Sequence, residues 1–199
     1  MDRSWDQSET WRQMEEVYKT GKVKAIGLAN WSIPYLETLK NTWTVVPAVN
    51  QVELHPLLPQ HELREYCQKL GILMEAYSPL GSTGRFSLAR PHLYHDAQPN
   101  VFPGAPIMSD PAIEEIAKKY GCSAATILIS YHVNRNTVVL PKSVTEKRIS
   151  SNKEIISISQ EDLATLDDLA VNGKAKRLNT PKWGFDLGFA DWYSPQYVK

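Results

Sequence analysis

The residues best suited to chemistry in this sequence are Lys142, Ser143, Thr145 and Arg148, which lie close together. Lys and Arg supply fixed positive charge, and Ser and Thr hydroxyls donate hydrogen bonds, a combination that suits a bound phosphate group. Cations near the end of a strand are also commonly a solvated face, and a Ser or Thr before a helix is commonly only a cap. The four residues alone therefore leave both interpretations open.

The elements expected around these residues would place them at the end of a strand. The apolar run Val138–Leu140 has the composition of a buried strand, and Pro141 ends it. A helix is expected over residues 146–152, with Thr145 as its N-cap. The unpaired N–H groups at the start of that helix would point back toward Lys142. The pattern favours a phosphate-binding site.

The rest of the chain repeats this strand and helix alternation. Further strands are expected over residues 24–30, 48–54 and 72–77. Helices are expected over residues 8–20, with Ser8 as the cap, and over 34–40, 61–70, 111–120, 124–133 and 159–170. Such alternation predicts an α/β fold built of parallel β/α units with right-handed crossovers. The long segment 78–109, rich in Pro and Gly, is expected to be a functional loop or disordered.

Polar or aromatic side chains stand at the end of each expected strand. They are Asn30 at the first, Asn50 and Gln51 at the second, Tyr77 and Ser78 at the third, and Lys142 and Ser143 at the fourth. Parallel α/β proteins bind ligands outside the carboxyl ends of their strands. Agreement among four strands is a stronger indication of a ligand site than any single motif.

The overall composition narrows the function classes. The 199 residues include 22 Lys plus Arg and 22 Asp plus Glu, so neither nucleic acid nor an anionic membrane surface is an expected partner. No apolar run reaches membrane-spanning length, and the N-terminal residues lack the apolar stretch of a secretory leader. Cys67 and Cys122 lack CxxC spacing, which favours free thiols in a reducing compartment, with the cytoplasm as the expected location. No residue spacing predicts a metal site.

Four runs carry a family resemblance. They are Gly21–Asn30 (GKVKAIGLAN), Val49–Pro56 (VNQVELHP), Glu75–Ser82 (EAYSPLGS) and Leu140–Thr145 (LPKSVT). In this order and spacing they resemble the aldo-keto reductase family, especially its aldose-reductase-like branch of fungal sugar and glycerol-type reductases. The resemblance covers nearly the whole chain. It implies a (β/α)8 TIM barrel that binds NADP(H) over the carboxyl ends of its strands and reduces small-molecule aldehydes or ketones to alcohols.

At the nicotinamide end of the cofactor the resemblance implies three contacts. Asn30 and Gln51 would hydrogen-bond the carboxamide, because each side chain supplies a donor and an acceptor. Tyr77 would stack on the ring and fix the face that offers the hydride. The alternatives are that Tyr77 is a core residue and that the two amides satisfy loop backbone groups.

The resemblance implies further contacts along the rest of the cofactor and at the substrate. Ser78, Leu80 and Ser82 would contact the pyrophosphate. Lys142, Ser143 and Arg148 would contact the adenosine 2′-phosphate, and Asn152 would lie near the adenine. Trp183 and Phe185 would contact the substrate. Lys and Arg at the phosphate favour NADP over NAD. Two departures from the family pattern weaken the enclosure of the cofactor: Ala29 replaces a common Ser, and Ser151 replaces a common Glu.

No residue of this chain is predicted to be catalytic. Proton transfer in the family needs a Tyr, a Lys, an Asp and a His on the first four strands and their loops, and this sequence has no matching Asp-x-x-x-x-Tyr or Ile-His-x-Pro run. His55 is expected to fix a loop. Glu53 and Glu75 do not suggest a paired-carboxylate site.

The sequence therefore predicts a single NADP-dependent oxidoreductase domain over residues 1–199, truncated at its N-terminal half. It corresponds to a partial (β/α)8 barrel, roughly the last four β/α units plus a C-terminal tail. A complete barrel takes ~250 residues, and four parallel strands leave two open edges. We expect this chain to keep the cofactor contacts and to lack turnover alone. The alternative is a non-catalytic half-barrel binding or assembly module that self-associates through its open sheet edges.

Overall fold

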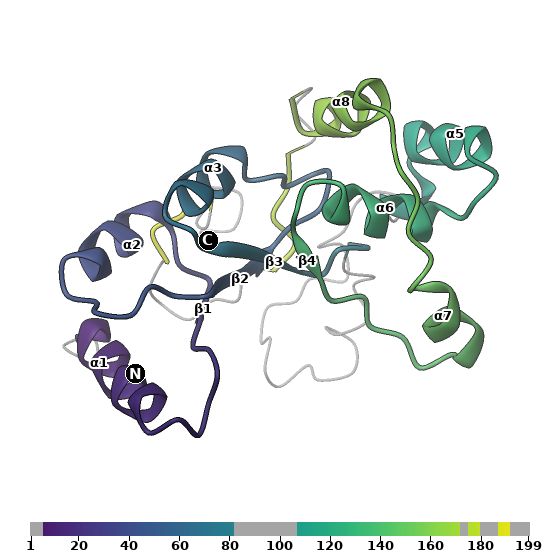
Figure 1. Ribbon diagram of the computed structural model, residues 1–199. Helices are drawn as coiled ribbons and strands as arrows, with labels where there is room; N and C mark the ends of the chain where they lie inside the picture. The colour runs from purple at the N-terminus through teal and green to yellow at the C-terminus, as the bar shows by residue number, and fades with distance from the viewer. Residues whose placement is uncertain (1–5, 82–106, 172–174, 180–186, 192–199) are drawn as a thin grey trace, which may run out of the picture.

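The computed structural model describes residues 6–81, 107–171, 175–179 and 187–191. Its elements follow in the order α1 (Gln7–Lys19), β1 (Leu28–Ala29), α2 (Ile33–Lys40), β2 (Val49–Glu53), α3 (His61–Lys69), β3 (Leu73–Tyr77), η2 (Ile107–Ser109), α5 (Pro111–Lys119), α6 (Ala124–Val133), β4 (Val138–Val139), α7 (Glu146–Ser151) and α8 (Gln160–Leu169). The alternation of strands and helices predicted from the sequence is present (Figure 1). The short 3₁₀ helix η2 was not predicted.

The four strands form one parallel sheet in the order β1-β2-β3-β4. Leu28 pairs with Asn50, Gln51 pairs with Glu75, and Glu75 pairs with Val138. Because all four strands are parallel, their carboxyl ends lie along the same edge of the sheet. The α/β class predicted from the sequence is therefore confirmed.

Strands β1 and β4 are shorter than predicted, although their backbone pairing extends beyond them. On the β1 side, the Ala48 N–H donates to the Ile26 carbonyl at 2.8 Å, and the Asn30 N–H donates to the Gln51 carbonyl at 2.8 Å. On the β4 side, the Leu140 N–H donates to the Ala76 carbonyl at 3.1 Å. The predicted span 24–30 is thus too long for the regular strand, but its far end is still hydrogen-bonded to β2.

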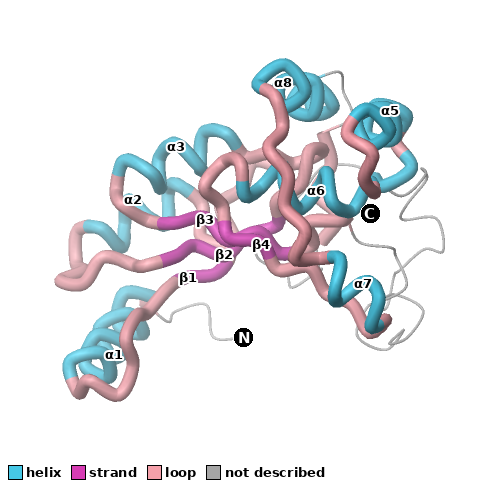
Figure 2. Tube along the Cα trace, turned by 45° about the vertical axis from the view of Figure 1, so that its right-hand side comes forward, coloured by secondary structure: helices cyan, strands magenta, loops and turns pink. Residues whose placement is uncertain are grey.

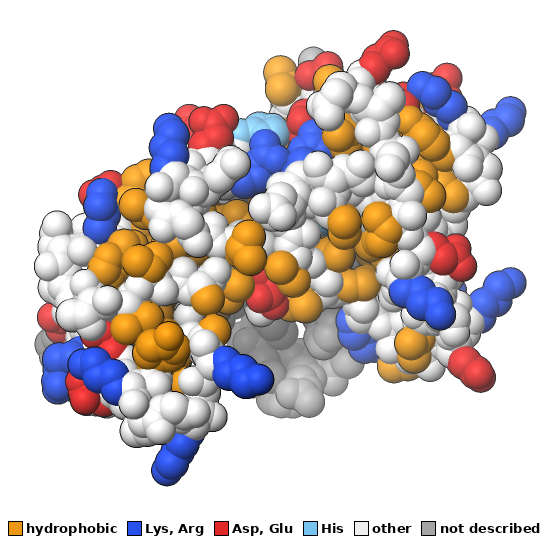
Figure 3. All heavy atoms as spheres, in the orientation of Figure 1, with side chains coloured by type: hydrophobic (Ala, Val, Ile, Leu, Met, Phe, Trp, Pro, Cys, Tyr) orange, Lys and Arg blue, Asp and Glu red, His pale blue; other side chains and the backbone are white. Residues whose placement is uncertain are grey.

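The two faces of the sheet differ sharply in burial. Asn50, Val52, Met74 and Ala76, which alternate along β2 and β3, are at most 3% exposed. Helices α2 and α3 cover this face, as Figure 2 shows. On the opposite face Leu73 is 42% exposed. The space-filling view accordingly shows hydrophobic side chains reaching the surface in the region of the strands (Figure 3).

Two hydrophobic clusters support the sheet. The first packs β1, β2 and β3 against α1, α2 and α3, with Trp11, Leu36 and Cys67 among its buried members. The second packs α5, α6 and α8 together around Ile113 and Leu166. Each helix named in these two clusters thus buries apolar side chains, and the clusters hold the strand ends in place. Within the described residues, no helix combines the length and apolarity needed to cross a bilayer.

Local capping explains most of the helix starts. The side chains of Asp110, Ser123 and Ser159 accept hydrogen bonds from the N–H groups of the first turns of α5, α6 and α8, as the sequence predicted. The prediction for α1 is wrong by two residues, because Asp6, and not Ser8, is the cap, and its carboxylate accepts from the Ser8 N–H at 2.9 Å.

Candidate functional site

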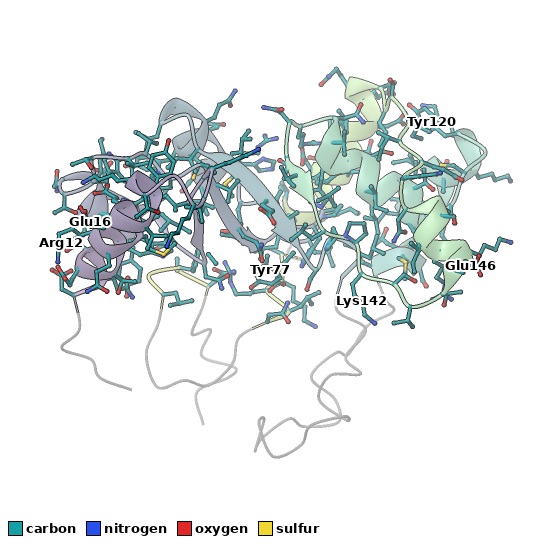
Figure 4. The ribbon with its side chains drawn as sticks, turned by 60° about the horizontal axis from the view of Figure 1, so that its bottom comes forward. Arg12, Glu16, Tyr77, Tyr120, Lys142 and Glu146 are labelled. Carbon is teal, nitrogen blue, oxygen red and sulfur yellow. The ribbon has the colours of Figure 1, made fainter. Side chains whose placement is uncertain are left out.

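The predicted site residues that the structure describes lie along the carboxyl edge of the sheet. Asn30 follows β1, Gln51 lies in β2, Tyr77 ends β3, and Lys142 follows β4. In Figure 4, Tyr77 and Lys142 lie on the same side of the molecule. Ser82, Trp183 and Phe185 lie outside the described residues. The structure therefore brings residues from four separate β/α units to one edge.

Asn30 has a buried side-chain oxygen that accepts no hydrogen bond from the described residues. Its backbone is left-handed, with φ of 60°, and its N–H donates to the Gln51 carbonyl at 2.8 Å. Its side-chain Oδ1 atom is buried and has no hydrogen-bond partner among the described residues. A buried amide oxygen without a donor is costly, so this atom is suited to accept a hydrogen bond from a ligand.

Gln51 lies beside Asn30 and is held by a carboxylate. Its Nε2 donates to Glu75 Oε1 at 2.8 Å, on the sheet face that the helices leave uncovered. No role was predicted for Glu75, yet its carboxylate fixes the orientation of the Gln51 amide. Because Nε2 is the donor to Glu75, the Oε1 atom of Gln51 is directed to the other side of the amide group.

Tyr77 is half-buried at the end of β3. Burial is the main cause that raises the pKa of its phenol above the ordinary value, and the nearby Glu53 carboxylate raises it further, against an opposing effect of Arg177. The phenol therefore stays protonated at neutral pH. A neutral ring at a strand end is suited to stacking on a planar ligand and not to donating a proton.

The chain after Tyr77 turns sharply along the same edge. Ser78 is left-handed, with φ of 52°, and its carbonyl accepts from the Gly81 N–H at 2.9 Å. Leu80 is partly buried and packs against the second hydrophobic cluster. The Ser78 hydroxyl accepts a hydrogen bond from Asn179 Nδ2 at 3.4 Å. This turn is thus tied to a segment near the C-terminus.

The predicted phosphate-binding residues lie on an exposed segment after β4. Lys142 and Arg148 are exposed, and neither forms an ion pair with any described residue. Ser143 Oγ accepts from the Thr145 N–H at 3.1 Å, which is the bond that starts this turn. Thr145 is the N-cap of α7, as predicted, although its side chain makes no capping hydrogen bond. Asn152 ends the helix as its C-cap.

A buried carboxylate that accepts four hydrogen bonds was not predicted from the sequence. Glu53 is 0% exposed at the end of β2. Its Oε1 accepts from His55 Nε2 at 3.0 Å and from the Leu178 N–H at 2.6 Å. Its Oε2 accepts from the Asn179 N–H and from Asn179 Nδ2, both at 2.9 Å. Glu53 therefore fastens residues 175–179, hereafter the C-terminal strap, to the carboxyl edge of the sheet.

These hydrogen bonds decide the charge state of Glu53. Burial alone would raise the pKa of this carboxyl group, but the hydrogen bond from His55 and those from the C-terminal strap outweigh burial and hold the pKa below its ordinary value. Glu53 is therefore ionised at neutral pH. Because the strap is more than a hundred residues away in sequence, no local pattern could have revealed this role.

An ion pair joins the C-terminal strap to residues 187–191. Arg177 Nε and Nη2 donate to the Asp191 carboxylate at 3.0 and 2.9 Å, and the Arg177 guanidinium lies 4.4 Å from the centroid of the Phe189 ring. Arg177 is 5% exposed. Phe189 packs against the first hydrophobic cluster. Residues 187–191 are thus held against the C-terminal strap and the first hydrophobic cluster.

A cavity of about 200 Å³ lies elsewhere, between the start of α1 and helix α2, with Trp31 and Tyr35 in its wall. None of the predicted site residues lines it. The carboxyl edge of the sheet is therefore the better candidate site, because it gathers the polar groups described above.

A parallel β/α sheet with polar groups gathered along its carboxyl edge is typical of β/α enzymes, which have barrel or doubly wound folds. The model of the aldo/keto reductase family matches residues 1–171, and the chain belongs to this family.

Curated relatives agree with this assignment. The chain is 45% identical over 196 residues to a D-galacturonate reductase of Hypocrea jecorina, a match that covers 96% of this chain and 57% of the relative. It is 41% identical over 182 residues to a glycerol 2-dehydrogenase (NADP(+)) of Saccharomyces cerevisiae, with 90% of this chain and 52% of the relative covered. The chain thus spans about half the length of the curated relatives it matches.

Solved structures of the family resemble the fold. An aldo-keto reductase of the silkworm, Bombyx mori, matches with a TM-score of 0.77 and 32% identity, over 94% of this chain and 54% of that chain. An aldo-keto reductase complexed with NADPH matches with a TM-score of 0.76 and 33% identity, over 94% and 56%. Both comparisons again extend over little more than half of the solved protein.

Proposed function

We propose that this chain is the cofactor-binding part of an NADP(H)-dependent aldo-keto reductase that reduces an aldehyde or ketone to an alcohol. The observation that carries the proposal is the buried Oδ1 atom of Asn30, without a partner among the described residues, beside Gln51 at the carboxyl edge of the sheet. Family membership and the resemblance to a structure complexed with NADPH support it. The activities named for two relatives, D-galacturonate reductase and glycerol 2-dehydrogenase (NADP(+)), favour a sugar acid or another small polyhydroxy carbonyl compound as the substrate class.

In this proposal the cofactor lies along the strand ends. Asn30 and Gln51 would hold the nicotinamide carboxamide, since one supplies an unpartnered acceptor and the other is oriented by Glu75. The neutral Tyr77 ring would stack on the nicotinamide. Ser78, Leu80 and Ser82 would follow the pyrophosphate. Lys142, Ser143 and Arg148 would hold the 2′-phosphate, with Asn152 near the adenine, because two exposed cations that form no ion pair with the described residues suit that group.

We further propose that the chain is the later half of a (β/α)8 barrel and lacks turnover alone. The sheet face opposite the helices carries Leu73 and Val138, each 42% exposed, and such a face is the interior of a closed barrel. The Tyr, Lys, Asp and His that the family uses for proton transfer have no counterpart in this sequence. Trp183 and Phe185 would contribute to the substrate site of a complete barrel. The two free thiols fit the cytoplasmic location predicted from the sequence.

A binding experiment tests the cofactor assignment. Titration of the purified chain with NADPH and with NADH, followed by cofactor fluorescence or calorimetry, should show tighter binding of NADPH. Lys142→Ala should weaken NADPH binding by about 10- to 100-fold, because a charge-assisted hydrogen bond to phosphate contributes about 1.5–3 kcal/mol. Lys147→Ala, which removes an exposed cation from α7, is the matched control and should have little effect. Equal affinity for the two cofactors, or none for either, contradicts the assignment.

A turnover experiment tests the second proposal. The chain mixed with NADPH and glyceraldehyde should leave the absorbance at 340 nm unchanged, because general acid catalysis usually contributes ~10²–10⁴-fold and its groups have no match here. Sustained consumption of NADPH by the pure chain would mean that the catalytic groups were misassigned.

The second candidate function is that of a non-catalytic assembly module. The observation that favours it is the exposed apolar face together with two short edge strands, β1 and β4, because open edges pair readily with other strands. Size-exclusion chromatography combined with the NADPH titration separates the candidates. A tight dimer that does not bind NADPH supports the assembly module, and a monomer that binds NADPH supports the reductase.

A further inference from the structure

Asn50 is fully buried behind the candidate site, and its side chain grips the backbone of the residue that follows Asn30. It lies in β2 on the helix-covered face and is 0% exposed. Its Oδ1 accepts from the Trp31 N–H at 3.3 Å, and its Nδ2 donates to the Trp31 carbonyl at 2.8 Å. One amide side chain thus satisfies both backbone groups of one residue, as a neighbouring strand would do.

This grip begins where the regular pairing of β1 with β2 ends. The last paired residue is Ala29, and the Asn30 N–H then donates to the Gln51 carbonyl at 2.8 Å. Asn30 is left-handed, a conformation that Asn tolerates better than most other residues but that is still less favourable than the ordinary helical or extended regions. The chain is held on both sides of Asn30. Gln51 holds the N–H on one side, and Asn50 holds Trp31 on the other.

The next residues belong to a rigid element. Ser32 is the N-cap of α2, and its carbonyl accepts from the Leu36 N–H at 2.9 Å. The Trp31 ring packs edge-on against Tyr35, with 6.2 Å between ring centroids, and borders the first hydrophobic cluster. Asn50 thus fixes the backbone between β1 and α2 at Trp31, which belongs to neither the strand nor the helix.

We propose that Asn50 is a positioning residue for the nicotinamide end of the cofactor. By fixing the Trp31 backbone it keeps Asn30 in the left-handed conformation, and so keeps the buried Oδ1 atom of Asn30 aimed at the carboxamide. The inference rests on the proposed function, because it assigns the held geometry to NADP(H) binding. Asn50 itself faces the helices and would not touch the cofactor.

The first measurement is amide hydrogen exchange at Trp31, which does not depend on any ligand. Asn50→Leu keeps the size of the side chain and removes both hydrogen bonds, so the Trp31 amide should exchange at least ~10-fold faster, while amides of α3 keep their wild-type rates. Val52→Ala is the matched control, since Val52 is 0% exposed on the same face of β2 and should leave Trp31 exchange unchanged relative to α3. Asn50→Ala, which also removes both hydrogen bonds to Trp31 and adds no bulk, provides a second variant should Asn50→Leu not fold.

The second measurement compares two ligands. Asn50→Leu should weaken NADPH binding by about 10-fold and leave the affinity for 2′-AMP, which lacks the nicotinamide, unchanged. A purely structural defect would weaken both. Wild-type exchange at Trp31 in Asn50→Leu, or in Asn50→Ala should Asn50→Leu not fold, overturns the positioning role, as does a parallel loss of NADPH and 2′-AMP affinity. If the wild-type chain does not bind NADPH, the proposed function on which this role rests is overturned instead. The Trp31 exchange data then report only the hydrogen bonds between Asn50 and the Trp31 backbone.

Discussion

Replacing Glu53 by Gln should loosen the C-terminal strap and destabilise the whole chain. The carboxylate is 0% exposed and accepts four hydrogen bonds, one from His55, one from Leu178 and two from Asn179. Gln has the same size, but one of its two polar ends is an N–H₂ group. In either orientation that group faces two donors, so two hydrogen bonds are lost and a buried donor is left without a partner.

The magnitude follows from those losses. Hydrogen bonds to a charged group contribute about 1.5–3 kcal/mol each, so the loss of two of them costs about 3–6 kcal/mol, and Gln avoids part of the cost of burying a charge. We therefore expect Glu53→Gln to lower the free energy of unfolding by about 3–5 kcal/mol, a large part of the 5–15 kcal/mol typical of a domain. Urea denaturation followed by circular dichroism measures this change, and hydrogen exchange at Leu178 and Asn179 reports whether the strap opens.

Glu75→Gln is the matched control for this experiment. Glu75 lies in the neighbouring strand, is only half-buried and accepts a hydrogen bond from Gln51 at 2.8 Å. Its replacement should lower the free energy of unfolding by only about 1 kcal/mol and leave the strap protected from exchange. If the two variants lose equal stability, or if the strap in Glu53→Gln keeps wild-type protection, the anchoring role of Glu53 is refuted.

Three further predictions concern pH, the strap and the phosphate end. Burial lowers the pKa of His132 from 6.5 to about 3, so the unfolded chain takes up a proton below pH 6.5 that the folded state resists. The free energy of unfolding should therefore fall as pH drops below 6.5, by up to about 1.4 kcal/mol per pH unit. Denaturation at pH 7.5, 6.0 and 5.0 should show a smaller fall for His132→Asn, and an equal fall in the two proteins would refute this. Asp191→Asn should increase protease cleavage after Arg177 by breaking the two-bonded ion pair, while equal cleavage rates would show that this pair does not hold the segment. Arg148→Ala should reduce NADPH affinity and leave NADH affinity unchanged in calorimetry, whereas a parallel loss for both cofactors would place Arg148 away from the 2′-phosphate.

The parts of the fold that depend on local patterns were predictable from the sequence. The caps Asp110, Ser123 and Ser159 each stand directly before an apolar helical repeat, and each makes the expected bond. The α/β class followed from the alternation of short apolar runs and amphipathic segments. The convergence of Tyr77 and Lys142 on one edge then followed from the geometry of parallel strands.

The contacts that depend on distant parts of the chain were not predictable in this way. Glu53 meets Asn179 only because the C-terminal strap folds back across the carboxyl edge of the sheet, and nothing near either residue indicates the pairing. The grip of Asn50 on Trp31 likewise needs the register of β1 against β2 to be known. Thr145 shows a limit of a different kind. It is the N-cap of α7, as its residue type predicted, but its side chain makes no capping hydrogen bond.

A crystal structure of the chain with bound NADP⁺ tests the central claim most directly. We expect the carboxamide nitrogen of the cofactor within ~3 Å of Asn30 Oδ1, the nicotinamide ring against Tyr77, and the 2′-phosphate beside Lys142. A cofactor bound away from the carboxyl edge of the sheet, with Asn30 Oδ1 still without a donor, would contradict it.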